Sequence, residues 1–388
     1  MDSMDKRIVF RYLMAGGAAL AVVHALGRFS FTPLLPYFID DHMLTITQGA
    51  DLATINYAGY LIGALIAVRY SGPNVIKKFL LIGLLGNALV TVIQCFVPQF
   101  AWLLVLRLFN GVSNGIVFVL APALLLEWLI TKNKAHLSGL VYFGVGGGLL
   151  AGGVLVDSTA SYFTAEYRWI PVAIVSSALA IFSAFRFYQL KIQPIDYKAS
   201  NGAKATLFDH RSIPLFLSYI GAGLGYILPM TFLPTLAHET MPADSLLVKN
   251  VWAITSLSSL LFIPLWNGIG HRFGDRISLI YTYILQALGV GSILLFPSTW
   301  GILICAVFIG GSFLGSVMCT QRLARYFQPH QGPRLSAALI AIYAGSQLIG
   351  PWLAKVWIEY GGTLLQSFAL GLGAFIWGLF WTWRTPKA

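Results

Sequence analysis

Charged side chains are scarce in this sequence of 388 residues. Asp, Glu, Lys and Arg together make up 10% of the chain, whereas hydrophobic residues make up 57%. Soluble domains usually carry about 25% charged residues. A soluble globule of this length would have to expose much of that apolar surface to water. The composition therefore excludes an ordinary soluble domain and predicts a protein whose solvent is lipid.

Cysteine is also rare, and the motifs of common enzyme classes are missing. Cys95, Cys305 and Cys319 all fall within apolar runs, which is typical of small buried hydrophobic residues and not of disulfides or metal ligands. We find no Walker motif, zinc-ligand cluster or nucleophile elbow. We therefore expect no catalytic residue, no metal and no cofactor, in a protein that is not an enzyme.

Apolar runs long enough to cross a bilayer, which takes about 20 helical residues, occur along the whole chain. They cover residues 12–39, 51–69, 78–98, 101–130, 137–157, 168–188, 213–238, 247–268, 277–297, 299–321, 335–357 and 363–383. The sequence thus predicts an all-α membrane protein with twelve transmembrane helices. The first run continues to about Ile39 without a small-residue cleavage site, so we expect no cleaved signal peptide. Pro229 and Pro234 should break the seventh helix.

The formal net charge of +11 has a topological meaning, because the basic residues lie between the apolar runs. With both termini in the cytoplasm, most Lys and Arg residues face the cytoplasm, and only Arg168, Lys249 and Lys355 lie on the other side. Cytoplasmic loops carry such an excess of positive charge. We expect a multi-pass protein of the bacterial inner membrane, surrounded by lipid, with both termini cytoplasmic and no nucleic-acid partner.

The chain repeats itself at an offset of about half its length. The matching features are Gly27 to Pro33 with Gly223 to Pro229, Asn56 with Asn250, Tyr142 and Gly144 with Tyr343 and Gly345, and Gly148 with Gly350. Parallel repeats with a substrate site between them are a recurrent transporter design. We predict two pseudo-symmetric six-helix halves, residues 1–190 and 212–388, joined by a polar cytoplasmic linker over residues 191–211.

Several segments resemble motifs of the major facilitator superfamily. Residues 268–276 are similar to its cytoplasmic loop motif, with His271 in place of Asp, and residues 107–115 are similar to its Arg-containing element of span four. Residues 144–153 match its antiporter motif except at Leu149, where the family has Pro. The opening segment, residues 27–36, resembles the YbfB/YjiJ-like bacterial branch. The resemblance implies alternating access, a small-molecule substrate, a monomer, and a leaning toward export coupled to protons.

Polar residues inside the spans are the candidates for substrate binding, because ionisable and amide groups at membrane depth face a cavity or another helix. Arg28 and Arg107 are candidates for clamping an anionic group. Arg107, Asn110 and Asn114 share one face of span four. The predicted substrate-binding residues are Arg28, Arg107, Asn56, Tyr60, Asn110, Asn114, Tyr226, Asn250, Tyr343 and Gln347. The alternative for each is hydrogen bonding between helices.

A second set of residues is predicted to act in coupling or gating. His24 lies four residues before Arg28 and titrates in a range that suits proton coupling, although a histidine at such a position also serves packing. Glu127 is a candidate partner for Arg69, Arg272 or Arg276 at a cytoplasmic gate, and the alternative is a carboxylate solvated at the surface. Four small or kinking residues, Gly148, Gly152, Gly350 and Pro351, let helices approach closely and rock.

Two buried arginines and few buried acids favour an anionic or carboxylate-bearing solute. We therefore predict a secondary active transporter of a small organic anion. A multidrug exporter of hydrophobic compounds, to which the 14% aromatic content adds support, is the first alternative. A membrane sensor that transports nothing is the second.

Overall fold

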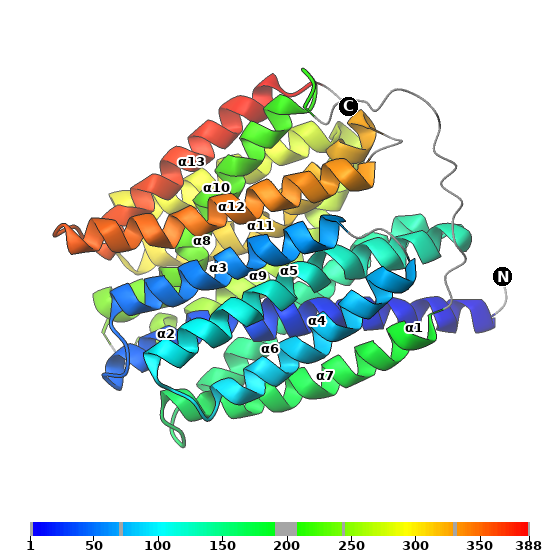
Figure 1. Cartoon of the computed structure of the whole chain (residues 1–388). Helices are drawn as coiled ribbons and strands as arrows, with labels where there is room; N and C mark the ends of the chain where they lie inside the picture. Colours follow the sequence, from blue (N-terminus) through cyan, green and yellow to red (C-terminus); the bar gives the residue numbers. More distant parts are fainter. Residues whose placement is uncertain (1–2, 70–72, 191–207, 243–244, 329–331, 387–388) are drawn as a thin grey trace.

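The computed structural model describes residues 3–69, 73–190, 208–242, 245–328 and 332–386. Every regular element in these ranges is a helix, and the ranges contain 12 spans long and apolar enough to cross a membrane (Figure 1). The predicted all-α membrane fold is thereby confirmed. The α-helices are α1 (Ser3–Leu20), α2 (Phe31–Asp40), α3 (Ile46–Arg69), α4 (Pro73–Gln94), α5 (Phe100–Thr131), α6 (Phe143–Asp157), α7 (Trp169–Gln189), α8 (Ile213–Thr240), α9 (Leu246–Phe273), α10 (Asp275–Leu295), α11 (Thr299–Phe327), α12 (Gly332–Glu359) and α13 (Leu364–Arg384). Three short elements complete them: the π-helix η1 (Ala21–Phe29) and the 3₁₀ helices η2 (Ala135–Tyr142) and η3 (Ala165–Arg168).

The helices lie side by side in one bundle, and α1 begins at the same end of it at which α13 ends (Figure 1). We call this end the terminal end and the opposite one the far end. The helices of the first six spans, coloured blue to green, pack mainly on one another, and so do those of the last six. The pairs α3 with α12, α6 with α9, and α2 with α8 join the two groups. Of the predicted linker, residues 191–207 lie outside the described ranges.

The first span is one continuous run in the sequence but three helical segments in the structure. The π-helix η1 separates α1 from α2, and the amide of Ser30 donates to the Ala25 carbonyl at 3.0 Å. Pro33 follows within α2 and lacks the N–H that an α-helix would direct at the Phe29 carbonyl. Single π-turns within α-helices occur frequently at functional sites. This segment carries Arg28.

The predicted break in the seventh span is wrong, because α8 continues through Pro229 and Pro234. Pro234 has no N–H to donate to the Met230 carbonyl, four residues earlier. The Thr32 hydroxyl on α2 donates to that carbonyl at 3.0 Å. A polar group from a neighbouring helix thus satisfies the orphaned acceptor, which is how membrane helices tolerate proline.

Helices α3 and α5 are packed backbone to backbone. A Cβ atom at Gly59 would lie 2.2 Å from the Leu108 carbonyl oxygen, and one at Gly111 would lie 2.0 Å from that of Asn56. Only glycine fits at such positions, and small residues at helix interfaces are typical of membrane bundles. The close approach fixes the rotation of α5, and with it the direction of Arg107.

Candidate functional site

Arg28 lies at the centre of the molecule, between the two groups of helices, and only 1% of its surface is exposed. Its guanidinium carbon lies 4.8 Å from the ring centroid of Phe29, 4.4 Å from that of Tyr57 and 4.7 Å from that of Tyr60. Aromatic faces attract a cation at such distances, and most strongly when it is desolvated. The three rings form a cage that holds the guanidinium in place without neutralising its charge.

Arg28 has no carboxylate partner among the residues that the structure describes. The ion pairs found there involve other cations. Its Nη2 donates to Oε1 of Gln347, while Nε and Nη1 have no hydrogen-bond partner in the described part of the chain. A buried charge without a counter-ion is costly.

The other group of helices meets Arg28 with an amide and a row of phenols. Gln347 on α12 accepts from Arg28 and donates through Nε2 to the Tyr226 hydroxyl on α8 at 3.0 Å. The Tyr226 ring stacks on that of Tyr343 at 5.5 Å, which in turn stacks on that of Tyr219 at 4.4 Å. The structure therefore brings together Arg28, Tyr60, Tyr226, Tyr343 and Gln347 from the predicted set. Phe29 and Tyr57 were missed, because only the packing shows which aromatic rings contact the guanidinium.

Arg107 is buried beside this cluster but points at main chain. Its Nη1 donates to the Gly27 carbonyl and its Nη2 to the Arg28 carbonyl, both at 3.1 Å. These carbonyls belong to the π-helix, where the regular α-helical bonding is interrupted. The geometry of Arg107 is thus that of a positioning residue, which holds the segment carrying Arg28.

The asparagines of spans two to four lie within the first group of helices and hold it together. Asn56 donates through Nδ2 to Oδ1 of Asn110 at 3.0 Å and to the Arg107 carbonyl at 2.8 Å. Asn87 donates to the Asn110 carbonyl at 3.1 Å. Asn114 is fully buried on the same helix as Asn110. These contacts match the packing alternative for the amides.

His24 lies one turn from Arg28, towards the terminal end. Its ring stacks on Phe118 with centroids 4.4 Å apart and meets Tyr60 edge-on at 6.3 Å. Its Nδ1 has no hydrogen-bond partner among the described residues. The histidine is therefore a neighbour of the Arg28 cage and shares Tyr60 with it.

Asn250 lies apart from both the cluster and the buried asparagines. Asn250 is exposed near the start of α9, and its amide donates to the Leu246 carbonyl of the same helix at 2.8 Å. Its repeat partner Asn56 is fully buried, so the two positions have different surroundings. The side chain of Glu127 lies outside the described part of the chain.

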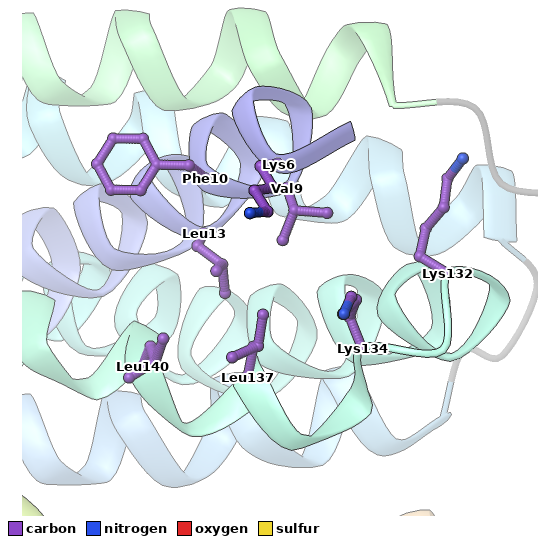
Figure 2. A pocket seen from close by; sticks show the side chains of 8 residues that line it. All are labelled: Lys6, Val9, Phe10, Leu13, Lys132, Lys134, Leu137 and Leu140. Atoms are coloured by element: carbon purple, nitrogen blue, oxygen red, sulfur yellow. The ribbon is translucent and has the colours of Figure 1, made fainter. Parts of the chain in front are cut away.

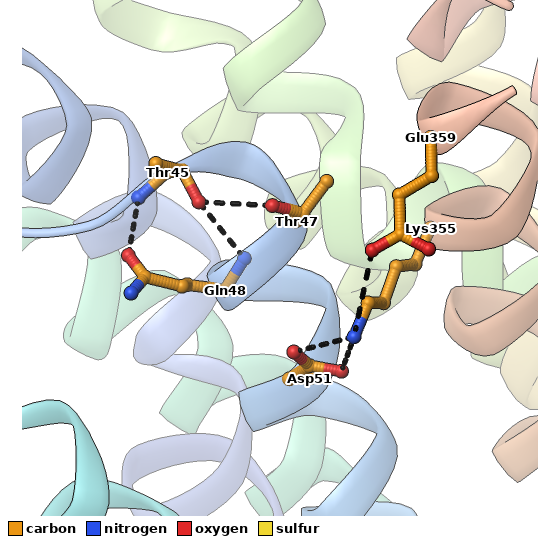
Figure 3. Close-up of polar contacts among 6 residues, drawn as sticks. All are labelled: Thr45, Thr47, Gln48, Asp51, Lys355 and Glu359. Atoms are coloured by element: carbon orange, nitrogen blue, oxygen red, sulfur yellow. Dashed lines mark hydrogen bonds and ion pairs between the residues drawn. The ribbon is translucent and has the colours of Figure 1, made fainter. Parts of the chain in front are cut away.

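Several polar contacts join the two groups of helices at or near the far end, among them the hydroxyls of Tyr57 and Thr231 at 2.8 Å and the side chains of His238 and Asp40 at 3.8 Å. Lys355 on α12 lies 2.8 and 2.9 Å from the two carboxylate oxygens of Asp51 on α3, and Glu359 lies 3.8 Å from the same ammonium group (Figure 3). The indole of Trp252 on α9 donates to the Leu149 carbonyl on α6 at 3.1 Å. With the bond from Thr32 to Met230, these contacts close the far end over the Arg28 cluster.

The loop after α9 contains an ion pair that the sequence did not reveal. Asp275 pairs with Arg322 of α11 at 2.5 Å, and Arg322 also donates to Asn267 at 2.6 Å. Arg272 is exposed on the last turn of α9, and Arg276 donates to the Thr382 and Trp383 carbonyls of α13. Asp275, the acidic residue of the loop motif, is thus bonded to α11. Arg276, one of the predicted gating residues, is bonded to α13.

The glycines of spans five and eleven make corresponding contacts in the two groups. A Cβ at Gly148 would lie 2.7 Å from Cβ of Ala25 on η1, and one at Gly350 would lie 2.4 Å from Cγ2 of Ile227 on α8. Gly152 faces Ser30 in the same way, at 2.6 Å from its Oγ, and Pro351 is buried within α12. In both groups, the fifth helix therefore packs tightly against the first.

Comparison with known proteins identifies a family for the whole bundle. Residues 20–380 match the family described as "Uncharacterised MFS-type transporter YbfB". The solved structure of the nucleoside transporter NupG is similar, with a TM-score of 0.69 over 97% of this chain and 98% of that chain, at 14% identity. A single-residue mutant of NupG gives a TM-score of 0.70 over 96% and 99%, again at 14% identity. At such identity the likeness shows the fold.

Two curated proteins are similar in sequence. A gallate transporter of Pseudomonas putida is 26% identical over 263 residues, which are 58% of this chain and 57% of that protein. Protein spinster of Drosophila melanogaster is 22% identical over 282 residues, which are 66% of this chain and 45% of that protein. The matched region thus spans little more than half of the first relative and less than half of the second.

Proposed function

The chain belongs to the major facilitator superfamily, whose members are transporters and not enzymes, and on that premise we propose that it carries a small organic anion. The observation that supports the anion is Arg28, a fully buried guanidinium with aromatic neighbours and no carboxylate partner among the described residues. A bound carboxylate supplies the missing counter-charge. Arginine binds carboxylates through strong charge-assisted hydrogen bonds, and Nε and Nη1 have no acceptor among the described residues.

The rings around Arg28 favour an anion that is itself aromatic. Tyr57 and Tyr60 present their faces to the guanidinium, and Tyr226, which stacks on Tyr343, is joined to it through Gln347. Offset stacking contributes about 0.5–1.5 kcal/mol per aromatic pair beyond buried area. The relative named as a gallate transporter supports the same class, since gallate is an aromatic carboxylate. We therefore assign aromatic carboxylates as the substrate class.

The position of the site supports transport by alternating access. Arg28 belongs to the first group of helices, and Gln347 and Tyr226 belong to the second. A substrate held between them contacts both, so its binding is coupled to the relative position of the groups. We propose that residues 1–190 and 212–388 are the moving halves, that residues 191–211 link them, and that the far end, which is closed here, faces the periplasm.

The direction of transport and its coupling form the finer part of the proposal. The glycine motif over residues 144–153, which packs on η1, supports export in exchange for protons. His24 is the proposed proton carrier, because it shares Tyr60 with the Arg28 cage. The test is substrate uptake into proteoliposomes under an imposed pH gradient. We expect His24→Gln to retain exchange of substrate for substrate but to lose the response to the gradient.

Substrate class is tested by thermal unfolding of the purified full-length chain in detergent. The probes are benzoate and gallate, with neutral benzyl alcohol and the hydrophobic cation tetraphenylphosphonium for comparison. A ligand that binds only the folded state stabilises it by about 2.7 kcal/mol at a hundred times its Kd. We expect the two carboxylates to raise the melting temperature and benzyl alcohol to have no effect.

Two variants tie the response to the site. Arg28→Ala removes the guanidinium and should abolish the shift that benzoate causes. Asn250→Ala is the matched control, because Asn250 is exposed and bonded only to its own helix, and it should keep the full shift. Stabilisation by tetraphenylphosphonium alone overturns the anion site and favours a multidrug exporter. A benzoate shift that survives in Arg28→Ala removes Arg28 from the site.

A further inference from the structure

A groove of about 330 Å³ lies at the terminal end of the bundle, between the beginning of α1 and the 3₁₀ helix η2 (Figure 2). Leu13, the lining residue of α1 that comes last in the chain, lies about four helical turns before Arg28. The described residues that line it are Lys6, Val9, Phe10, Leu13, Lys132, Lys134, Leu137 and Leu140. Three of these eight side chains are cationic, five are apolar, and none is acidic.

Two of the three lysines lie at one end of the groove, and Lys6 lies beside the apolar side chains of α1 (Figure 2). Along α1, Lys6 comes before Phe10 and Leu13, and along the second wall Lys134 comes before Leu137 and Leu140. Figure 2 shows Lys132 and Lys134 at one end of the groove and Phe10 and Leu140 at the other. An α-helix rises about 1.5 Å and a 3₁₀ helix about 2.0 Å per residue. The apolar part therefore extends roughly 10 Å into the bundle from the lysines.

The groove is open to the outside of the bundle along its apolar part. Phe10 is 63% exposed and Leu140 is 46% exposed, although both lie within spans that are apolar enough to cross a membrane. Side chains at this depth face acyl chains. The lysines lie where the spans begin or end, at the level of lipid headgroups.

We propose that the groove is a binding site for one anionic phospholipid of the leaflet at the terminal end. The phosphate lies between the ammonium groups of Lys6, Lys132 and Lys134, and one acyl chain lies along Phe10, Leu13 and Leu140. Charge complementarity selects the anionic headgroup, because each basic residue near a membrane surface attracts acidic lipid by about 1 kcal/mol. A zwitterionic headgroup brings its own cation to a groove lined by cations and is disfavoured.

Such a lipid bridges two parts of the chain that lead to the substrate site. Helix α1 continues into η1, which carries Arg28, and η2 continues into α6, which packs on η1. A ligand that binds only the folded bundle, in which α1 lies against η2, stabilises it by RT ln(1 + [L]/Kd).

The test uses the full-length chain, purified in detergent and stripped of lipid. The probes are dioleoylphosphatidylglycerol, dioleoylphosphatidylcholine and inorganic phosphate, and the readouts are the melting temperature and the lipid retained in native mass spectrometry. We expect phosphatidylglycerol to raise the melting temperature and to be retained as a one-to-one adduct. Phosphatidylcholine and phosphate should do neither.

Two triple variants with the same change in charge locate the site. Replacing Lys6, Lys132 and Lys134 by Gln should weaken phosphatidylglycerol binding by at least about tenfold. Replacing Arg69, Arg211 and Arg384 by Gln removes three exposed cations from the same end and should leave binding unchanged. In addition, Phe10→Ser with Leu140→Ser should weaken binding of the dioleoyl lipid but not of a short-chain phosphatidylglycerol.

Three results would overturn the proposal. An equal loss in both triple variants assigns the effect to the overall charge of that end. Equal stabilisation by phosphatidylcholine removes the headgroup selectivity. A shift produced by inorganic phosphate alone makes the groove an anion site without a lipid.

Discussion

Lys355 of α12 and Asp51 of α3 form an ion pair that connects the two groups of helices at the far end of the bundle (Figure 3). Their side chains are 26% and 32% exposed, so water screens the pair only in part. The pair lies between the far surface and the Arg28 cluster. We expect this ion pair to break whenever the far end opens.

Breaking this pair should favour the open far end. We expect Lys355→Met to raise the ratio of open to closed molecules by about fivefold, which corresponds to about 1 kcal/mol for a partly exposed pair. The measurement is the labelling rate of Thr235→Cys with a membrane-impermeant maleimide, in a background where the three native cysteines are replaced by serine; Thr235 is buried on α8 and its hydroxyl has no hydrogen-bond partner among the described residues. Asp51→Lys combined with Lys355→Asp should restore slow labelling. Fast labelling in that double variant would show that the ion pair does not hold the far end closed.

A carboxylate placed beside Arg28 should stabilise the fold and block the site. Gln347→Glu puts a counter-ion where Oε1 already accepts from Arg28, so the melting temperature should rise by a few degrees, or about 1 kcal/mol. The shift caused by benzoate should disappear, because the guanidinium is then neutralised. Gln286→Glu is the control: Gln286 is fully buried on α10 and donates to the Thr282 carbonyl, so an unpaired carboxylate there should lower the melting temperature. A lower melting temperature in Gln347→Glu would contradict the inference that Arg28 lacks a counter-ion.

Replacement by Lys should lower the stability of the fold at Arg107 but weaken ligand binding at Arg28. Arg107→Lys replaces a guanidinium that donates to two main-chain carbonyls by a single ammonium group. We expect this change to lower the free energy of unfolding by about 2 kcal/mol. Arg28→Lys keeps the charge and should retain the melting temperature while weakening benzoate binding. Thermal unfolding with and without benzoate separates the two effects. If Arg107→Lys instead keeps full stability and loses only binding, Arg107 contacts the substrate directly.

Two neighbouring glycines of α6 should respond in opposite directions to alanine. Gly148→Ala places a methyl group 2.7 Å from Ala25, and such overpacking costs about 1–3 kcal/mol. Gly147→Ala meets nothing within 4 Å and should stabilise the helix by up to about 1 kcal/mol. Thermal unfolding of both variants checks the pair, and equal effects would argue against the contact between α6 and η1.

The orientation of the bundle is open to a direct test. We expect both termini to face the cytoplasm, because most Lys and Arg residues lie at the terminal end. A fluorescent reporter that folds only in the cytoplasm, fused after Ala388, should be bright, and a periplasmic phosphatase at the same place should be inactive. The reverse pattern in the two fusions would invert the topology and would place Asp51 and Lys355 in the cytoplasm.

The sequence by itself determined the class of the molecule, the twelve spans and the motifs that identify the family. These are local properties: the length of an apolar run decides whether a helix can cross a bilayer, and the glycine pattern is visible without any contact. The central position of Arg28 was also predictable, because a charge inside a span must turn away from lipid. The residues that contact the Arg28 guanidinium could not be predicted from the sequence.

Only the tertiary structure decided which polar side chains meet. Arg107 looked equivalent to Arg28 in the sequence, but it donates to the carbonyls of the π-helix. Asn250 repeats Asn56 by offset, yet it is exposed where Asn56 is buried. Pro234 leaves α8 intact because Thr32, remote in the chain, donates to the orphaned carbonyl. These outcomes depend on how each helix is rotated and shifted against its neighbours, and in lipid that is set by close packing and hydrogen bonds between helices.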